Sequence, residues 1–157
     1  MRRLFPIIFA LLVLIAGCAD RWSDIGGVED ITDQMLLERV GNYSASRWSG
    51  KLEADFGTAW RYSASWGELT GARRMLELRA GAETTVQAAY TAEETGDGLI
   101  VAVICADDTV IRLSPGDNPL SLPEGRNWLV AASYHSPASF QVDLALETGS
   151  LRVDTDD

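Results

Sequence analysis

The stretch SFQVDLALE, residues 139–147, alternates apolar and polar side chains without a break. Successive side chains of a β-strand point to opposite faces of a sheet, so this period of two predicts a strand with one buried face and one solvated face. The side chains expected to point inward are Phe140, Val142, Leu144 and Leu146, and those expected to point outward are Gln141, Asp143, Ala145 and Glu147. A buried face requires a second apolar layer to cover it.

A longer alternation lies upstream, in KLEADFGTAWRYSASW at residues 51–66. Its even positions are mostly apolar, from Leu52 through Phe56 and Trp60 to Trp66, and these are predicted to face inward. The run exceeds the usual strand length of about five or six residues. Gly57 is therefore expected to form a bend or bulge that keeps the alternation in phase.

Several more segments have strand patterns and are separated by turns rich in glycine, proline and aspartate. Residues 99–106, LIVAVICA, are apolar at every position, which predicts a central strand. The other segments are residues 73–81, 84–92, 109–113, 128–134 and, at an edge, 151–157. Together they predict an all-β domain over residues 48–153, an antiparallel β-sandwich or jelly roll of about eight strands.

A single short helix is predicted over residues 31–41, before the strands. Asp30 or Thr32 is suited to cap its first turn, and Gly41 to end it, because glycine adopts the left-handed conformation at little cost. A helix this short is unstable alone and must dock on the body or order only in part.

The N-terminus has the three parts of a signal peptide. Arg2 and Arg3 precede thirteen apolar residues, 4–16, which are too few for the roughly 20 residues that cross a bilayer. The charged residues Asp20, Arg21 and Asp24 follow closely, so the apolar run cannot extend further.

The residues Leu14-Ile15-Ala16-Gly17-Cys18 resemble the lipobox of bacterial lipoproteins. The resemblance implies a signal peptide at 1–17, cleavage between Gly17 and Cys18, and attachment of fatty-acyl chains such as palmitate to Cys18. Residues 18–30 would then be a lipidated tether, and the protein would be extracytoplasmic and anchored in the bacterial membrane. The alternative is an ordinary secretory signal cut near Ala19, with Cys18 unmodified.

The net charge of the chain limits the classes of partner that it can bind. The chain carries 13 basic and 23 acidic residues, and loss of Arg2 and Arg3 leaves 11 basic residues and a net charge of −12. This charge argues against nucleic acid as a partner and against a domain lying flat on anionic lipid. We therefore expect the domain to stand off the membrane, with Trp22 in the tether reaching the membrane interface.

The sequence contains no recognisable catalytic or metal-binding constellation. His135 is the sole histidine, and it is expected in an exposed loop; no G-x-S-x-G motif is present. Cys105 lies in an apolar run and is expected to be a buried, unreactive thiol. One histidine and one free cysteine are too few ligands for a zinc site. Asp107-Asp108 and the acidic C-terminus provide oxygen atoms, but without the spacing of a calcium loop. We predict no cofactor, no metal and no catalytic residue.

The body also resembles the β-sandwich domain of small, uncharacterised bacterial lipoproteins and secreted proteins, in its turns and its final amphipathic strand, over about 75 residues. This resemblance implies a fold and no activity. The leading functional hypothesis is a non-catalytic module that binds a protein or glycan at the cell envelope. The alternatives are a small envelope hydrolase and an accessory or structural subunit of an envelope complex. The four sheet tryptophans, Trp48, Trp60, Trp66 and Trp128, are predicted to be core residues and not a sugar-binding platform.

Overall fold

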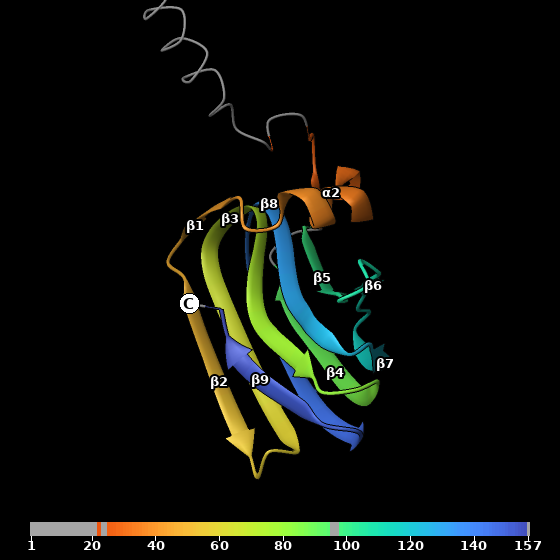
Figure 1. Ribbon diagram of the computed structural model, residues 1–157. Helices are drawn as coiled ribbons and strands as arrows, with labels where there is room; N and C mark the ends of the chain where they lie inside the picture. Colours follow the sequence, from red (N-terminus) through yellow and green to blue (C-terminus); the bar gives the residue numbers. More distant parts are fainter. Residues whose placement is uncertain (1–21, 23–24, 95–97, 157) are drawn as a thin grey trace, which may run out of the picture.

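The computed structural model describes residues 22, 25–94 and 98–156 (Figure 1). Within these residues, the first elements are a 3₁₀ turn, η1 (Val28–Asp30), and one helix, α2 (Asp33–Arg39). The strands follow in the order β1 (Tyr43–Ser46), β2 (Ser49–Asp55), β3 (Ala59–Ala80), β4 (Thr84–Glu94), β5 (Leu99–Ile104), β6 (Val110–Arg112), β7 (Gly116–Leu122), β8 (Gly125–Thr148) and β9 (Leu151–Thr155). The described strand pairings are all antiparallel, which confirms the all-β prediction.

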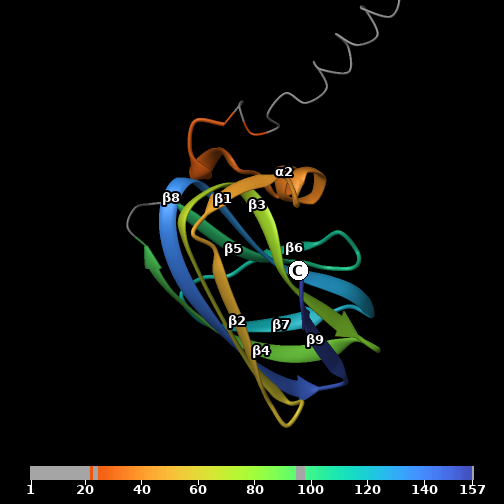
Figure 2. The ribbon, with the colours of Figure 1, turned by 90° about the vertical axis from the view of Figure 1, so that its left-hand side faces the viewer.

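Two long strands, β3 and β8, run through both layers of the fold and pair with each other along most of their length. The first layer contains β2, the N-terminal half of β3, the C-terminal half of β8, β4 and β7. The second contains β1 and β9, the C-terminal half of β3, the N-terminal half of β8, β5 and β6. The result is a jelly-roll β-sandwich whose layers share their central strands (Figures 1 and 2).

The bend between the layers lies where the register of β3 against β8 shifts, between Trp66 and Gly71. Gly71 has φ +107°, and a Cβ there would collide with the carbonyl oxygen of Asn42, so the bend needs a glycine at this position. The partner strand β8 bends at the same level, where His135 has φ +52°.

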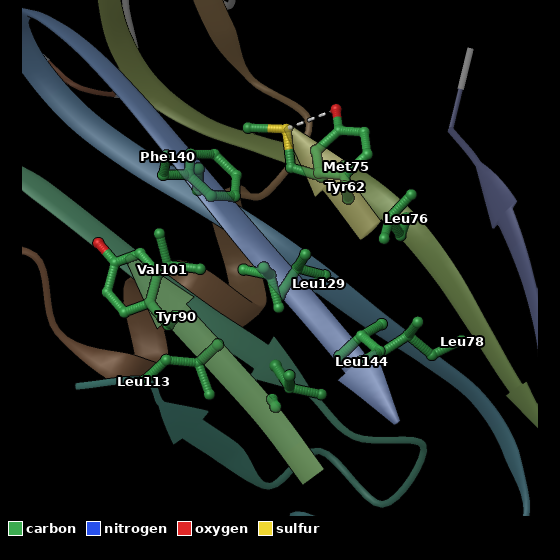
Figure 3. Packing of buried hydrophobic residues seen from close by; sticks show 14 of the residues in the cluster. Tyr62, Met75, Leu76, Leu78, Tyr90, Val101, Leu113, Leu129, Phe140 and Leu144 are labelled. Atoms are coloured by element: carbon green, nitrogen blue, oxygen red, sulfur yellow. Dashed lines mark hydrogen bonds between the residues drawn. The ribbon is translucent and has the colours of Figure 1, made fainter. Parts of the chain in front are cut away.

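The space between the layers is filled with apolar side chains (Figure 3). The Tyr62 hydroxyl lies 3.8 Å from the sulfur of Met75, although both residues belong to β3. This contact joins the two halves of one strand across the sandwich. The alternation of residues 139–147 is confirmed for Phe140, Val142 and Leu144, which are at most 4% exposed.

The prediction for residues 51–66 is correct for Leu52, which is half-buried and packs against the core, and for the second half of the run, but it fails around Phe56. Trp60 and Trp66 are buried, but Phe56 is 99% exposed. The chain does not bulge at Gly57; it reverses, because residues 56–58 form a hairpin turn between β2 and β3, closed by a 3.2 Å hydrogen bond from Thr58 N to Asp55 O. An alternating pattern continues through such a turn without a visible break, which is why the period alone did not locate it.

The outer side of the second layer carries its own apolar cluster, covered by α2 and the residues before it. Strand β5 is therefore apolar on both faces: Val101 and Val103 face the sandwich, while Ala102 and Ile104 face the helix layer. The central position predicted for this segment is confirmed, since β5 pairs with β8 and β6.

Helix α2 lies within the predicted range 31–41 and is docked on the body. The Thr32 side chain accepts a 3.2 Å hydrogen bond from Met35 N, as expected of a cap. Leu36 is fully buried, and Arg112 of β6 reaches both Asp33 (2.8 Å) and the carbonyl oxygen of Ile31 (2.6 Å).

The prediction that Trp22 lies in a free tether is wrong. Trp22 is 2% exposed, and its indole Nε1 donates a 2.6 Å hydrogen bond to Asn42 O. The Arg39 guanidinium lies 5.8 Å from its ring centroid. A large apolar ring next to an uncovered sheet face is stabilised by burial there, and the sequence pattern around residue 22 does not show that face.

No helix in residues 22, 25–94 and 98–156 is long and apolar enough to span a bilayer.

Candidate functional site

The outer side of the first layer has no helix over it and forms a polar sheet surface, which we call the polar face. It is built by the outward-facing residues of β2, β3, β8 and β4, and strand register decides which of these residues lie side by side. Ser49, Ser65, Ser139 and Glu93 form one row across the four strands, and Lys51, Ser63, Gln141 and Thr91 form the next.

A groove of 580 Å³ runs over these two rows. Hydroxyl, amide and charged side chains line most of it, with the edges of buried Ala64 and Phe140 at its floor. A second groove, of 490 Å³, lies further along the same strands, over Glu53, Asp55, Arg61, Gln87 and Asp143.

The charged groups in the middle of the polar face are paired. Lys51 Nζ lies 2.6 Å from Glu53, and its hydrogen bond and charge lower the pKa of that carboxyl. Arg61 Nε lies 2.6 Å from Asp143, whose hydrogen bond and charge raise the pKa of Arg61. Gln141 adds a 2.9 Å hydrogen bond to Asp143. These pairs hold the long side chains in place and leave the serine and threonine hydroxyls as donors and acceptors for a ligand.

Sequence reasoning assigned the polar-face residues only to the solvated side of separate strands. The available signal was that the outward positions of residues 59–66, 84–92 and 139–147 are small or polar throughout. These three segments lie side by side because β3 and β4 both pair with β8. A local sequence pattern cannot predict this pairing.

His135 does not lie in a loop; it is in β8, at the bend. It is exposed, as predicted. Its Nδ1 contacts Glu68 Oε1 at 2.7 Å and Thr70 Oγ1 at 3.1 Å. In a catalytic triad the acid bonds one nitrogen of the histidine ring and the nucleophile bonds the other. Glu68 and Thr70 both contact Nδ1 of His135, so they do not form this arrangement.

The prediction that Cys105 is buried is confirmed, at 4% exposure, one residue beyond the end of β5. Burial, and then the charge of Asp107, raises the pKa of the thiol. A raised pKa disfavours the thiolate, which is the reactive form.

The sheet tryptophans do not form an exposed platform. Trp60 and Trp66 are buried, while Trp48 and Trp128 are half-buried. Trp48 stacks on Trp66 with 5.5 Å between ring centroids, and Arg73 covers it at 4.0 Å. Arg74 lies 4.9 Å from the ring centroid of Trp128. All four therefore have protein groups on at least one ring face.

Two of the acidic side chains considered as oxygen donors have partners nearby in the chain, Asp107 in its turn and Asp154 within β9. Asp107 Oδ1 accepts a 3.1 Å hydrogen bond from Thr109 N, which lowers the pKa of that carboxyl, and Asp154 pairs with Arg152 at 2.7 Å. Within the described part of the chain, no group of three or more His, Cys, Asp or Glu residues could hold a metal ion. Gly17, Cys18 and the predicted signal peptide lie outside the described residues.

No protein-family model and no curated protein matches this sequence. Among solved structures, a cupin domain from Bordetella pertussis is similar with a TM-score of 0.36 and 10% identity, over 67% of this chain and 98% of that one. An RmlC-like cupin protein from Desulfovibrio desulfuricans gives 0.32 and 12%, over 63% and 82%. The polyketide cyclase RemF from Streptomyces resistomycificus gives 0.36 and 12%, over 83% and 80%.

Proposed function

We propose that this protein is an extracytoplasmic lipoprotein, anchored in the bacterial membrane through Cys18, that binds a protein partner through its polar face and performs no catalysis. The lipobox-like residues 14–18 support the anchor. The single observation that supports binding is the 580 Å³ groove on the outer side of the first layer. No helix covers this side, whereas α2 covers the outer side of the second layer.

A protein is favoured over a glycan as the occupant. Glycan-binding surfaces stack sugar rings on exposed aromatic faces. In the described part of the chain the large exposed apolar side chains are Tyr43 and Phe56, and neither lines the polar-face grooves. Hydroxyl and amide groups around paired charges resemble the polar rim of a protein interface.

The hydrolase alternative has little support from the site. The serines of the groove have no histidine beside them, since His135 is at the bend and is bonded to Glu68 and Thr70. The accessory-subunit alternative predicts the same surface contact, with the difference that the partner, and not this protein, performs the work of the complex.

The anchor is tested with two matched cysteine variants in bacterial cells. Cys18→Ser should move the protein to the soluble fraction, whereas Cys105→Ser should leave it with the membrane. Retention of Cys18→Ser on membranes after detergent-free washing would contradict the lipoprotein assignment.

The polar face is tested by photo-crosslinking in the intact envelope. A photoreactive residue at exposed Ser65, in the groove, should give one stoichiometric protein adduct, and the same residue at exposed Ser114, outside it, should not. Equal labelling at both positions, or a glycan-array signal that Ser65→Arg abolishes, would contradict the proposal. Glycan hydrolysis lost on changing one groove carboxylate would favour the hydrolase.

A further inference from the structure

The hairpin turn between β2 and β3 places an apolar ring in solvent on a backbone that does not favour it. Phe56 has φ +49° and Gly57 φ +71°, so both central residues of the turn have positive φ, as in a type I′ turn. Asn, Asp or Gly is preferred at such a position, and a bulky residue there is an outlier. The turn is nonetheless well anchored, because Leu146 N donates a 2.8 Å hydrogen bond to Thr58 O.

Phe56 gains nothing from the protein's own fold in return for this conformation. It is 99% exposed and has no ring contact within the described residues. The other exposed large apolar side chain among the described residues, Tyr43, is 42% exposed and is covered by Arg73 at 5.2 Å. Of the four described non-glycine residues with positive φ, Phe56 alone has an apolar side chain. Backbone strain and full exposure together indicate a residue retained for an external contact.

The charges around the turn indicate the chemistry of the surface that Phe56 would contact. Two carboxylates lie near the turn: Asp55 precedes it, and Glu147 follows Leu146, whose N–H bonds the turn. Both are exposed, and neither has an ion pair among the described residues. The neighbouring cations Lys51 and Arg61 are already taken by Glu53 and Asp143. An apolar tip with an acidic rim is complementary to an apolar pocket with a basic rim.

The position of the turn separates it from the membrane side. The described chain enters the body at Trp22 beside α2, and the β2–β3 turn lies at the opposite end in both views (Figures 1 and 2). If Cys18 is the anchor, the tip points away from the bilayer. Its acidic rim is also repelled by anionic lipid.

We propose that Phe56 is the anchor residue of the contact between this protein and its partner, and that the partner is a protein presenting an apolar pocket rimmed by Lys or Arg. The tip continues the polar face, because Asp55 and Glu53 line the second groove. This inference rests on the proposed binding function and names the residue and the pocket chemistry that it uses.

The test uses the full lipidated protein with a photoreactive phenylalanine analogue at position 56, and at Tyr43 as the matched aromatic control. Position 56 should crosslink to the same protein that is captured from Ser65, and position 43 should not. With that protein purified, Phe56→Ala should weaken binding about 30-fold, the scale of an aromatic hot spot, while Tyr43→Ala changes it less than about twofold. Asp55→Asn combined with Glu147→Gln should slow association and reduce its dependence on salt.

Each other outcome overturns the inference in a recognisable way. An adduct at Ser65 with unchanged affinity of Phe56→Ala overturns it and leaves the proposed function standing, whereas no adduct at either position overturns both. Binding of the soluble Cys18→Ser form to phosphatidylglycerol-containing vesicles that Phe56→Ala abolishes would identify a lipid surface instead. A dimer in sedimentation velocity that depends on Phe56 would identify a second copy of this chain.

Discussion

Replacing Trp22 measures how firmly the segment before α2 belongs to the folded body. The ring is 2% exposed and packs in the outer cluster with Ile25, Ile31 and Leu36. A buried tryptophan removes about 200 Å² from water, which at about 25 cal/mol per Å² gives about 5 kcal/mol as an upper estimate. Trp22→Ala should therefore lower the free energy of unfolding by about 4 kcal/mol, a large share of the 5–15 kcal/mol typical of a domain.

The conservative change Trp22→Phe separates packing from hydrogen bonding. Phenylalanine keeps most of the apolar contact but loses the indole donor to Asn42 O. That carbonyl retains a second donor, Ala72 N at 3.3 Å, so the loss does not leave it unsatisfied. The expected cost is about 1–2 kcal/mol, clearly smaller than for alanine.

Both variants are measured by urea unfolding of the soluble Cys18→Ser form, followed by far-UV circular dichroism so that the lost indole does not affect the signal. A change below about 0.5 kcal/mol for Trp22→Ala, the range of an ordinary surface substitution, would refute the docking of this segment. With Trp22 docked, only three residues separate it from Cys18, and four steps of about 3.5 Å give a reach of about 14 Å, so a lipid anchor at Cys18 would hold the α2 end of the domain close to the membrane.

Three further predictions follow from other parts of the fold. Phe56→Asn should raise the unfolding free energy by about 1 kcal/mol, and the Tm in a calorimetric scan by about 3 °C, because asparagine tolerates positive φ and no buried surface is lost; a lower Tm would contradict the assignment of strain. Asn127→Ala should lower the free energy of unfolding in urea by about 2–3 kcal/mol, because this fully buried amide accepts a hydrogen bond from Ala106 N at 3.0 Å and donates one to Leu78 O at 3.1 Å. A decrease under about 0.5 kcal/mol would show that these hydrogen bonds are dispensable. Cys105 should resist a thiol reagent at pH 8 in the folded protein and react fully in denaturant, since burial raises the pKa of the thiol and keeps it protonated; rapid native labelling would contradict this.

The separate elements of this protein were predictable where a local pattern and its environment agree. The alternation in residues 139–147 identified the inward face of β8, since Phe140, Val142 and Leu144 are buried. Residues 99–106 were apolar throughout, and residues 99–104 of this run proved to form a central strand between two apolar layers. Thr32 marked the start of α2, because a hydroxyl at that position satisfies a backbone N–H that the helix itself leaves free.

The predictions failed where the outcome depended on contacts distant in sequence. Phe56 is at a position that the alternation assigns to the buried face, but it is exposed on a turn. The alternation did not reveal the turn, because a period of two is unchanged when the chain reverses. Trp22 had no periodic neighbours, and its burial depends on the open outer face of the second layer.

By itself, then, the sequence determined the all-β class, the inward faces of the later strands, the one helix of the described residues and the burial of Cys105, because each of these follows from short-range pattern or from composition. Only the tertiary structure decided that β3 and β8 cross both layers, that Ser65, Ser139 and Gln141 share one open face, and that Phe56 is exposed on the β2–β3 turn. The physical reason is that strand pairing joins residues far apart in sequence, such as Arg61 and Asp143, which are 82 positions apart. The energy that selects one pairing comes from burying the apolar faces of the whole sheet together, which no single segment reports.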